Sequence, residues 1–298
     1  MRKIKKYALS PAVLAKIITN GVYQIPPHIK FIDNILYRMS FSRSHRIIVC
    51  LPPRHGKSEL ISKYFPLWYL TTFSGKRLLL ASYEANFAAY WGRKVRDLIE
   101  NFGKYFNVSV EKGASASNYF ELSNTSSMMT AGAGGALTGK GADLLIIDDP
   151  VKNAEEANSE TIRQNIWDWF ASTAYTRIEP GGSCIIIMTR WHKQDLVGRL
   201  LENYSNEWQL VKIPAIATIA DPLGRSPGEV LWEERFPIDT LEKIKKQIGS
   251  YWFSALYQQE PSDKANSLFK REHFKYYKQT DSYALVDGHS VNLTECIN

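Results

Sequence analysis

Cysteine is scarce in this sequence, which has three such residues among 298 (Cys50, Cys184 and Cys296). Three cysteines cannot build the disulfide framework of a small secreted domain. Cys50 and Cys184 both lie in strongly apolar runs, which indicates reduced side chains in the core of a cytosolic protein. The sequence also contains no run that approaches the ~20 apolar residues needed by a membrane-spanning helix. We therefore expect a packed globular protein with no membrane contact.

Acidic residues are almost missing from the first part of the chain. The first 58 residues contain eleven Lys and Arg but one acid, Asp33, while the whole chain has 37 basic and 30 acidic residues. The net charge of +7 is therefore concentrated near the N-terminus. Such a basic region favours a polyanionic partner, a nucleotide or a nucleic acid, with a solvated basic face as the alternative.

Several motifs of other enzyme classes are also missing. The six histidines have no spacing suited to a zinc site. No Gly-x-Ser-x-Gly elbow is present, and the chain has no internal repeat or low-complexity tract. The sequence therefore gives no support for a zinc enzyme, a serine hydrolase or a repeat protein.

Short apolar runs alternate with helical patterns along the chain. The runs are residues 47–51, 78–81, 144–147 and 185–188. Continuous apolar runs of this length are typical of buried parallel strands, and helices between such strands predict an α/β domain with a parallel sheet. Further helices are predicted over residues 11–19, before Ser40, and near residues 239–248 and 251–258.

A Gly-Lys-Ser sequence follows the first apolar run, at Gly56, Lys57 and Ser58. The place between a strand and a helix is that of a nucleotide-binding phosphate loop. In this interpretation the Lys57 ammonium bridges the β- and γ-phosphates of ATP and takes part in catalysis, while the Ser58 hydroxyl binds Mg²⁺. Leu51 replaces the usual first glycine, and an ordinary helix N-cap is the alternative. We predict that the nucleotide binds along the residues of this loop: Pro53, Arg54, His55, Gly56, Lys57, Ser58 and Glu59.

Two carboxylates, Asp148 and Asp149, end another apolar run. Ligands bind at the carboxyl ends of parallel strands, so we expect Asp148 at the edge that carries the phosphate loop, where it holds Mg²⁺ with Ser58. Asp149 is then placed to orient the attacking water and to accept its proton, as the catalytic base. A simple Asp-Asp-Pro turn is the alternative. Together, the two motifs favour a P-loop nucleoside triphosphatase.

Ordered blocks of sequence between about residues 46 and 261 resemble the ATPase of the large terminase subunit of tailed phages. The blocks are Pro-Pro-Arg-His-Gly-Lys-Ser (52–58), Ala-Ser-Tyr (81–83), the glycine-rich segment with its acidic strand (134–150), Met-Thr-Arg-Trp-His (188–192), Asp-Leu-Val-Gly-Arg-Leu (195–200) and Tyr-Gln-Gln-Glu-Pro (257–261). The resemblance implies an α/β fold of the P-loop NTPase (RecA/ASCE-like) type. Such a fold has a central, mostly parallel sheet flanked by helices, with a small C-terminal lid or linker subdomain.

The same resemblance implies a motor that hydrolyses ATP with Mg²⁺ and drives double-stranded viral DNA into a procapsid. Its partners would be double-stranded DNA, the phage portal protein and the small terminase subunit. Its subunits would assemble as a homo-oligomeric ring on the portal, in the host cytoplasm.

Further site residues follow from the resemblance alone. Thr189 is expected at the nucleotide, and Arg190 in a coupling segment that contacts the γ-phosphate, with a surface salt bridge as the alternative for Arg190. Arg54 would help to sense the nucleotide. Lys140 and Arg177 are candidates for the basic finger that a neighbouring subunit inserts during catalysis.

Three domains are predicted: an ATPase core with N-terminal helices (1–206), a lid or linker subdomain (207–262) and the start of a truncated nuclease domain (263–298). No carboxylate cluster suited to two-metal chemistry follows Pro261, so nuclease activity is not expected from this chain. Two alternatives stay open, a helicase-like DNA-dependent ATPase and an inactive prophage remnant that binds DNA or the portal.

Overall fold

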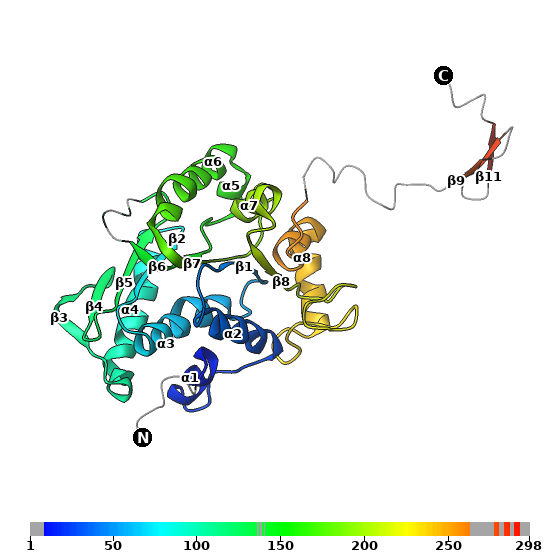
Figure 1. Cartoon of the computed structure of the whole chain (residues 1–298). Helices are drawn as coiled ribbons and strands as arrows, with labels where there is room; N and C mark the ends of the chain where they lie inside the picture. The colour runs from blue at the N-terminus through cyan, green and yellow to red at the C-terminus, as the bar shows by residue number, and fades with distance from the viewer. Residues whose placement is uncertain are drawn as a thin grey trace. The chain divides into compact units, whose positions relative to one another are not determined.

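The computed structural model describes residues 9–135, 137, 139, 141–262, 277–279, 283–286 and 289–292 (Figure 1). The chain divides into two units, Met1–Pro261 and Ser262–Asn298. In the described part of the second unit, three short strands pair antiparallel in the order β11-β10-β9: β9 (Tyr277–Gln279), β10 (Tyr283–Val286) and β11 (His289–Asn292). Most of the segment predicted to begin a nuclease domain lies outside the described residues.

An eight-stranded sheet with the order β3-β4-β5-β2-β6-β7-β1-β8 forms the centre of the first unit. Six of its strands, from β5 to β8 in that order, are parallel, and β3 and β4 extend it antiparallel at one edge. The strands are β1 (Arg46–Cys50), β2 (Arg77–Ser82), β3 (Val110–Ser115), β4 (Tyr119–Leu122), β5 (Ser127–Gly132), β6 (Ala142–Asp148), β7 (Ile178–Met188) and β8 (Gln209–Lys212).

The strand register brings the functional segments to one edge of this sheet. Cys50, which ends β1, lies opposite Met188, which ends β7. Asp148, the last residue of β6, lies opposite Ile187 and Ser82. The phosphate loop, the acidic pair and the segment after β7 therefore all leave the sheet at its carboxyl edge, as the apolar runs predicted.

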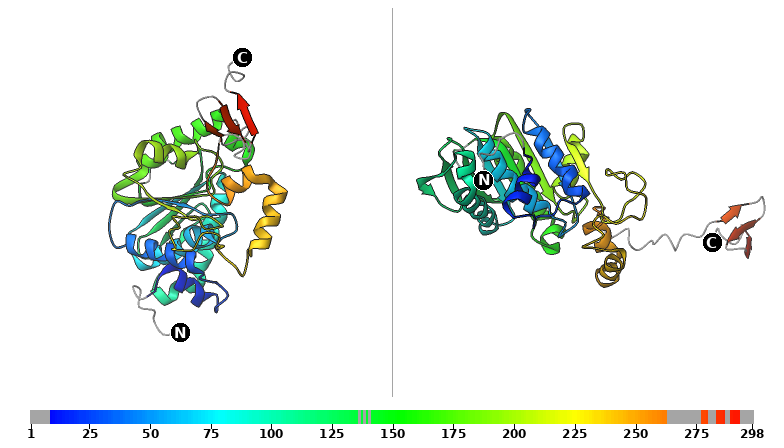
Figure 2. Two further views of the ribbon diagram at one scale, coloured as in Figure 1. Left: turned by 90° about the vertical axis from the view of Figure 1, so that its right-hand side faces the viewer. Right: turned by 90° about the horizontal axis from the view of Figure 1, so that it is seen from below.

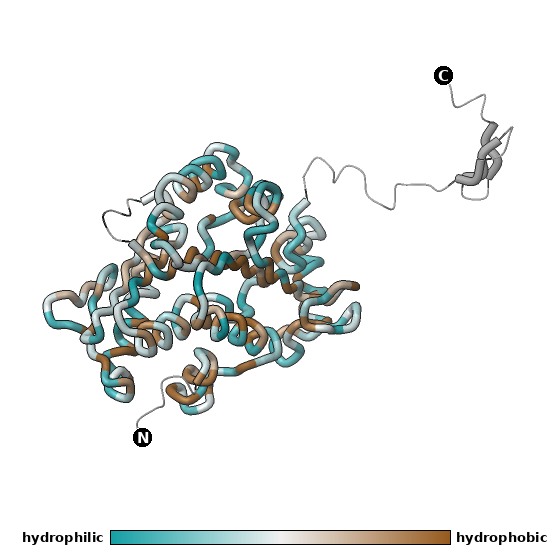
Figure 3. The backbone as a smooth tube through the Cα atoms, in the orientation of Figure 1, coloured by the Kyte–Doolittle hydropathy of each residue, from teal (hydrophilic) through white to brown (hydrophobic). Residues whose placement is uncertain are grey.

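Side chains alternate between the two faces of the sheet and build a separate core on each. In β1, Ile47 and Val49 face one core, while Ile48 and Cys50 face the other. Figure 3 shows the hydrophobic residues gathered along the central strands. Because both faces of the central parallel strands β1, β2, β6 and β7 are covered by helices, these strands contain continuous apolar runs.

Helices cover both faces of the sheet (Figures 1 and 2). One layer holds α1 (Pro11–Ile18), α2 (Pro27–Met39), the π-helical turn η1 (Glu59–Tyr64), α3 (Phe65–Thr72), α4 (Ala85–Phe102) and the 3₁₀ turn η2 (Gly103–Phe106). The other layer holds α5 (Ala154–Asn158), α6 (Glu160–Trp169), η3 (Phe170–Ala174), η4 (Tyr175–Arg177) and α7 (Leu196–Tyr204). The predicted α/β fold, with helices on both faces of a mostly parallel sheet, is confirmed.

A small third core lies beyond β8, in the segment predicted as a lid or linker. Ala215, Leu241 and Phe253 are its buried centre. Its one long helix, α8 (Ile238–Leu256), is kinked at Gly249, where φ is 81°. The kink divides α8 into two helical pieces, which correspond to the two short helices predicted there. No helix among the described residues is long and apolar enough to cross a membrane.

Candidate nucleotide-binding site

The phosphate loop connects β1 to the helical segment η1–α3 by a turn with two left-handed residues. Gly56 has φ 85°, and a Cβ there would lie 3.2 Å from the Ile29 side chain, so glycine fits both the backbone and the space. Arg54 has φ 65°, an uncommon conformation for a residue with a Cβ. Leu51, which stands where the first glycine of such loops is usual, is fully buried at the end of the strand. This loop therefore makes its turn at Arg54 and Gly56 without a glycine at its start.

Lys57 lies at the centre of the site. Its Nζ is 2.9 Å from Asp149 Oδ2 and donates a hydrogen bond to Thr189 Oγ1 at 2.8 Å. The backbone N–H of Thr189 donates to Asp149 Oδ1 at 2.8 Å, which closes a three-residue ring of contacts. Asp149 itself has φ 45°, a left-handed conformation that aspartate tolerates better than most residues. The structure thus brings together three residues that the sequence predicted separately.

Asp148 lies below the loop and is fully buried. Ser58 Oγ donates to its Oδ1 at 2.9 Å, and Ser62 Oγ donates to its Oδ2 at 2.6 Å. Ser62 lies in the π-helical turn η1, a local distortion that is frequent at functional sites. Sequence reasoning missed Ser62, although its spacing of four residues from Ser58 places both hydroxyls on one side of a helix.

Burial shifts the titration of this carboxyl. Removal from water raises the pKa of Asp148 from 3.8 to about 7, and the nearby charge of Asp149 adds to the rise. Lys57 and the two serine hydroxyls oppose the shift. A carboxylate in this position gains from an additional cation, because a positive charge offsets its desolvation.

An open cavity of about 610 Å³ lies above these residues. Small-molecule sites occupy roughly 300–1,000 Å³, so the space suits a nucleotide. Eight of the predicted site residues line it, together with Trp191 from the segment after β7: Pro53, Arg54, Gly56, Lys57, Ser58, Glu59, Asp149 and Thr189. The opposite wall is aromatic and was not predicted as part of the site: Tyr83, Phe87, Tyr90 and Trp91.

His55 does not face this cavity. Its side chain is fully buried, its Nδ1 lies 2.9 Å from the Pro53 carbonyl oxygen, and its ring stacks on Phe236 at 4.6 Å between centroids. The His28 Nε2 lies 3.0 Å from the His55 carbonyl oxygen, and Trp232 packs against His28 at 5.3 Å. Burial lowers the pKa of His55 to about 4, so the ring is neutral near pH 7. His55 therefore joins the phosphate loop to the segment before α8, and its contacts are packing and loop bracing.

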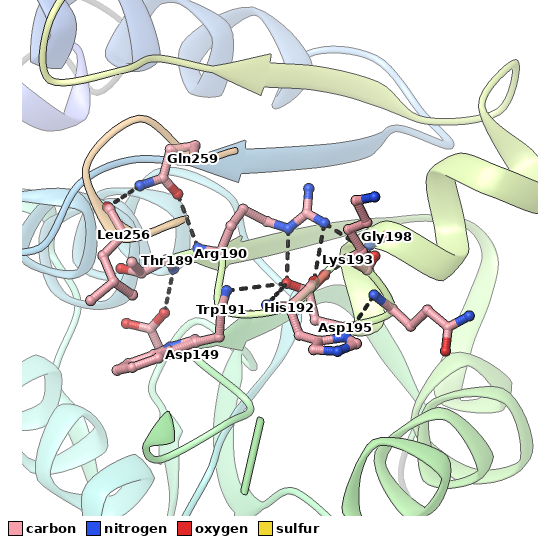
Figure 4. Close-up of polar contacts among 11 residues, drawn as sticks. Asp149, Thr189, Arg190, Trp191, His192, Lys193, Asp195, Gly198, Leu256 and Gln259 are labelled. Carbon is pink, nitrogen blue, oxygen red and sulfur yellow. Dashed lines mark hydrogen bonds and ion pairs between the residues drawn. The ribbon is translucent and has the colours of Figure 1, made fainter. Parts of the chain in front are cut away.

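Arg190 is not among the residues that line the cavity, and Figure 4 shows its side chain directed at Asp195. Its Nε donates to Asp195 Oδ2 at 2.8 Å, and the residue is 8% exposed. Asp195 in turn caps α7, since its Oδ1 accepts a hydrogen bond from the Gly198 N–H at 2.8 Å. The ion pair is therefore buried, where sequence reasoning had placed a γ-phosphate contact or a surface salt bridge. The backbone N–H of Arg190 donates to Gln259 Oε1 at 3.0 Å.

One of the two candidates for a basic finger, Arg177, is not brought to this site. Lys140 lies outside the described residues. Arg177 ends η4 just before β7, at the edge of the sheet opposite the phosphate loop. Their roles stay predictions.

These features define a P-loop nucleotide-binding protein with a strand, β7, inserted between the phosphate-loop strand and the acidic strand. Residues 48–276 match the family model described as "Terminase large subunit, T4likevirus-type, N-terminal". The match spans more than half of the chain, and the chain belongs to this family. The resemblance found in the sequence is confirmed.

Two solved structures of large terminases have the same fold. The large terminase of bacteriophage HK97 has a TM-score of 0.53 and 14% identity, covering 80% of this chain and 51% of that one. The large terminase ATPase domain of Thermus phage P74-26 has a TM-score of 0.56 and 16% identity, covering 85% of this chain and all of that one. The chain thus spans about half the length of the HK97 protein. Among curated proteins, no sequence matches the chain.

Proposed function

We propose that this chain is the ATP-hydrolysing motor part of a terminase large subunit, which translocates double-stranded viral DNA into a procapsid. One observation carries the proposal: Lys57, Asp149 and Thr189 contact one another beside the Ser58–Asp148 pair at the carboxyl edge of a parallel sheet. This arrangement supplies a cation for phosphates, oxygen ligands for a metal and a carboxylate for a water molecule. Family membership supports the same function.

The oxygen donors fit Mg²⁺ as the metal. Ser58 and Asp148 present a hydroxyl and a carboxylate within 2.9 Å of each other. Mg²⁺ is commonly held by one or two protein oxygens, with phosphates and water completing an octahedron. No cluster of three or more His, Cys, Asp or Glu suited to a metal occurs among the described residues. When bound, Mg²⁺ would neutralise charge on the triphosphate.

The contacts of Lys57 suggest how the chain controls its catalytic base. In the structure, Lys57 is paired with Asp149. A triphosphate offers the ammonium several negative oxygens, so Lys57 turns from Asp149 towards the phosphates as the nucleotide binds. Asp149 is then free to accept a hydrogen bond from a water molecule beside the γ-phosphate and to take its proton. The Thr189 N–H holds the carboxylate in place during this exchange.

We also propose partners and an assembled form for this motor. Double-stranded DNA, the portal protein and the small terminase subunit are its proposed partners, and a homo-oligomeric ring on the portal is its proposed form. The site of action would be the host cytoplasm. The concentration of basic residues in the first 58 positions supports contact with a polyanion.

Phosphate release from ATP tests the proposal. We expect turnover that requires Mg²⁺ and increases with double-stranded DNA, and that Lys57→Ala and Asp148→Ala abolish. Lys76→Ala is a matched control, because it removes a Lys–Asp ion pair of 3.4 Å at the opposite edge of the sheet. ATP turnover by folded Lys57→Ala at the wild-type rate would contradict the site. Turnover that ignores DNA would contradict the motor, and strand separation would favour a helicase.

A further inference from the structure

The Tyr-Gln-Gln-Glu segment at 257–260 has no role in the chemistry described above. It follows α8 and ends one residue before the boundary of the first unit, at Pro261. Its side chains make contacts with several parts of the core. Gln258 makes two hydrogen bonds to the backbone of Ile216, and Glu260 forms an ion pair of 2.9 Å with Lys212 at the end of β8. The segment thus fastens the end of α8 to its surroundings.

Gln259 is the member of this segment that contacts the strand end at the nucleotide site. It is 1% exposed and has φ 58°, a left-handed conformation that is uncommon outside glycine. Its Oε1 accepts a hydrogen bond from the Arg190 N–H at 3.0 Å, and its Nε2 donates to the Leu256 carbonyl oxygen (Figure 4). Leu256 lines the nucleotide cavity. One side chain therefore links the strand end, the helix end and the cavity wall.

The two residues after β7 divide their backbone N–H groups between two partners. Thr189 donates to the carboxylate of Asp149, and Arg190 donates to the amide of Gln259. The peptide between them is short and stiff, so a displacement of Asp149 and a displacement of Gln259 act on the same piece of backbone. The Arg190 side chain is itself fixed by Asp195, which limits other ways for this backbone to relax.

We infer that Gln259 is a positioning residue for ATP hydrolysis: through the Arg190 N–H it holds Thr189, and through Thr189 it sets the place of the Asp149 carboxylate. This inference rests on the proposed function. It assigns Gln259 no contact with the nucleotide.

Replacing Gln259 by Met tests the inference, with Gln258→Met as the matched control. Both variants remove a buried or half-buried amide of the same size, but Gln258 bonds to Ile216 and has no bond to the strand end. We expect Gln259→Met to lower the kcat for ATP about tenfold, the usual effect of losing one buried hydrogen bond. The KM for ATP should stay within about twofold, because uniform binding is untouched. Gln258→Met should keep the wild-type kcat.

A second variant separates positioning from simple loss of packing. Gln259→Glu has the same shape, and its protonated carboxyl can both accept from the Arg190 N–H and donate to the Leu256 carbonyl oxygen. The ionised form cannot donate, and burial favours the protonated form. The kcat of Gln259→Glu relative to wild type should therefore rise as pH falls, while the relative kcat of Gln259→Met should not change.

Hydrogen exchange provides a test that does not depend on turnover. In the nucleotide-free chain, we expect the Arg190 amide to exchange at least about tenfold faster in Gln259→Met than in wild type or Gln258→Met. Equal exchange in all three proteins, or equal kcat in the two Met variants, would overturn the inference. A wild-type chain without ATP turnover would contradict the proposed function, and the exchange comparison would still decide whether Gln259 holds the Arg190 backbone.

Discussion

The contact between Lys57 and Asp149 leads to a prediction in which affinity and turnover change in opposite directions. Asp149→Asn keeps the shape of the side chain and an oxygen that accepts from the Thr189 N–H. It removes the charge that holds Lys57 at 2.9 Å. In the proposed mechanism, Lys57 leaves Asp149 when a triphosphate binds, so wild type loses an ion pair on binding and the variant does not.

The size of the effect follows from the partial burial of the pair. The side chains are 9% and 27% exposed, so the pair lies between the exposed case, worth about 0.2–1 kcal/mol, and the buried case, in which loss of one partner costs about 3–5 kcal/mol. A value near 1.4 kcal/mol corresponds to a tenfold change in Kd. We expect Asp149→Asn to bind ATP about three- to tenfold more tightly than wild type, and to hydrolyse it at least about 100-fold more slowly because the base is lost.

Titration calorimetry with ATP and Mg²⁺, combined with single-turnover phosphate release, measures both quantities. Asp143→Asn is the control, since it neutralises a carboxylate that pairs with Lys76 at the opposite edge of the sheet. It should change neither affinity nor rate. Weaker or unchanged ATP binding by Asp149→Asn would refute the competition between Asp149 and the phosphates for Lys57.

Three other perturbations test the structure around the site. Burial raises the pKa of Asp148 from 3.8 to about 7. The contribution of Asp148 to the stability of the nucleotide-free chain is therefore complete below about pH 4 and is lost as pH rises through 7. Chemical denaturation should show this fall in the free energy of unfolding with pH in wild type and not in Asp148→Asn. His55→Leu removes the bond to the Pro53 carbonyl and should raise the KM for ATP severalfold with little change in kcat, as steady-state kinetics can show; an unchanged KM would mean that the brace does not order the loop. Gly198→Ala places a Cβ 1.6 Å from the Lys193 carbonyl oxygen and should destabilise the chain by about 3 kcal/mol or more in thermal unfolding, whereas a wild-type Tm would contradict the packing at the start of α7.

The centre of the site could be predicted from the sequence because the positions of its residues follow from the arrangement of the parallel strands. Lys57, Asp148 and Asp149 each end or follow a buried apolar run, and parallel strands bring such ends to one edge. Thr189 was expected from the family resemblance. The nature of each side chain then indicates its chemistry. The four central strands were predicted from continuous apolar runs. Of the two N-terminal helices, the first was predicted from its start and stop residues and the second from apolar residues at helical spacing.

The parts that sequence reasoning missed depend on tertiary contacts or on weak local patterns. Strand β3 is largely polar, and β4 has four residues with a glutamate among them, so no continuous apolar run marks either strand. The burial of His55 depends on Phe236, which lies far along the chain. The direction of the Arg190 side chain is set by its buried ion pair with Asp195. The sequence around an arginine that follows a strand does not show whether its side chain contacts a phosphate or forms such a buried ion pair.

The central claim is that a Mg²⁺-triphosphate occupies the cavity beside Lys57, and a crystal structure with Mg²⁺ and a non-hydrolysable ATP analogue tests it most directly. We predict Mg²⁺ between the Ser58 hydroxyl and the Asp148 carboxylate, Lys57 Nζ on the phosphate oxygens, and Asp149 separated from Lys57. An analogue bound elsewhere in the molecule, or a Lys57–Asp149 contact that persists in the complex, would contradict this account.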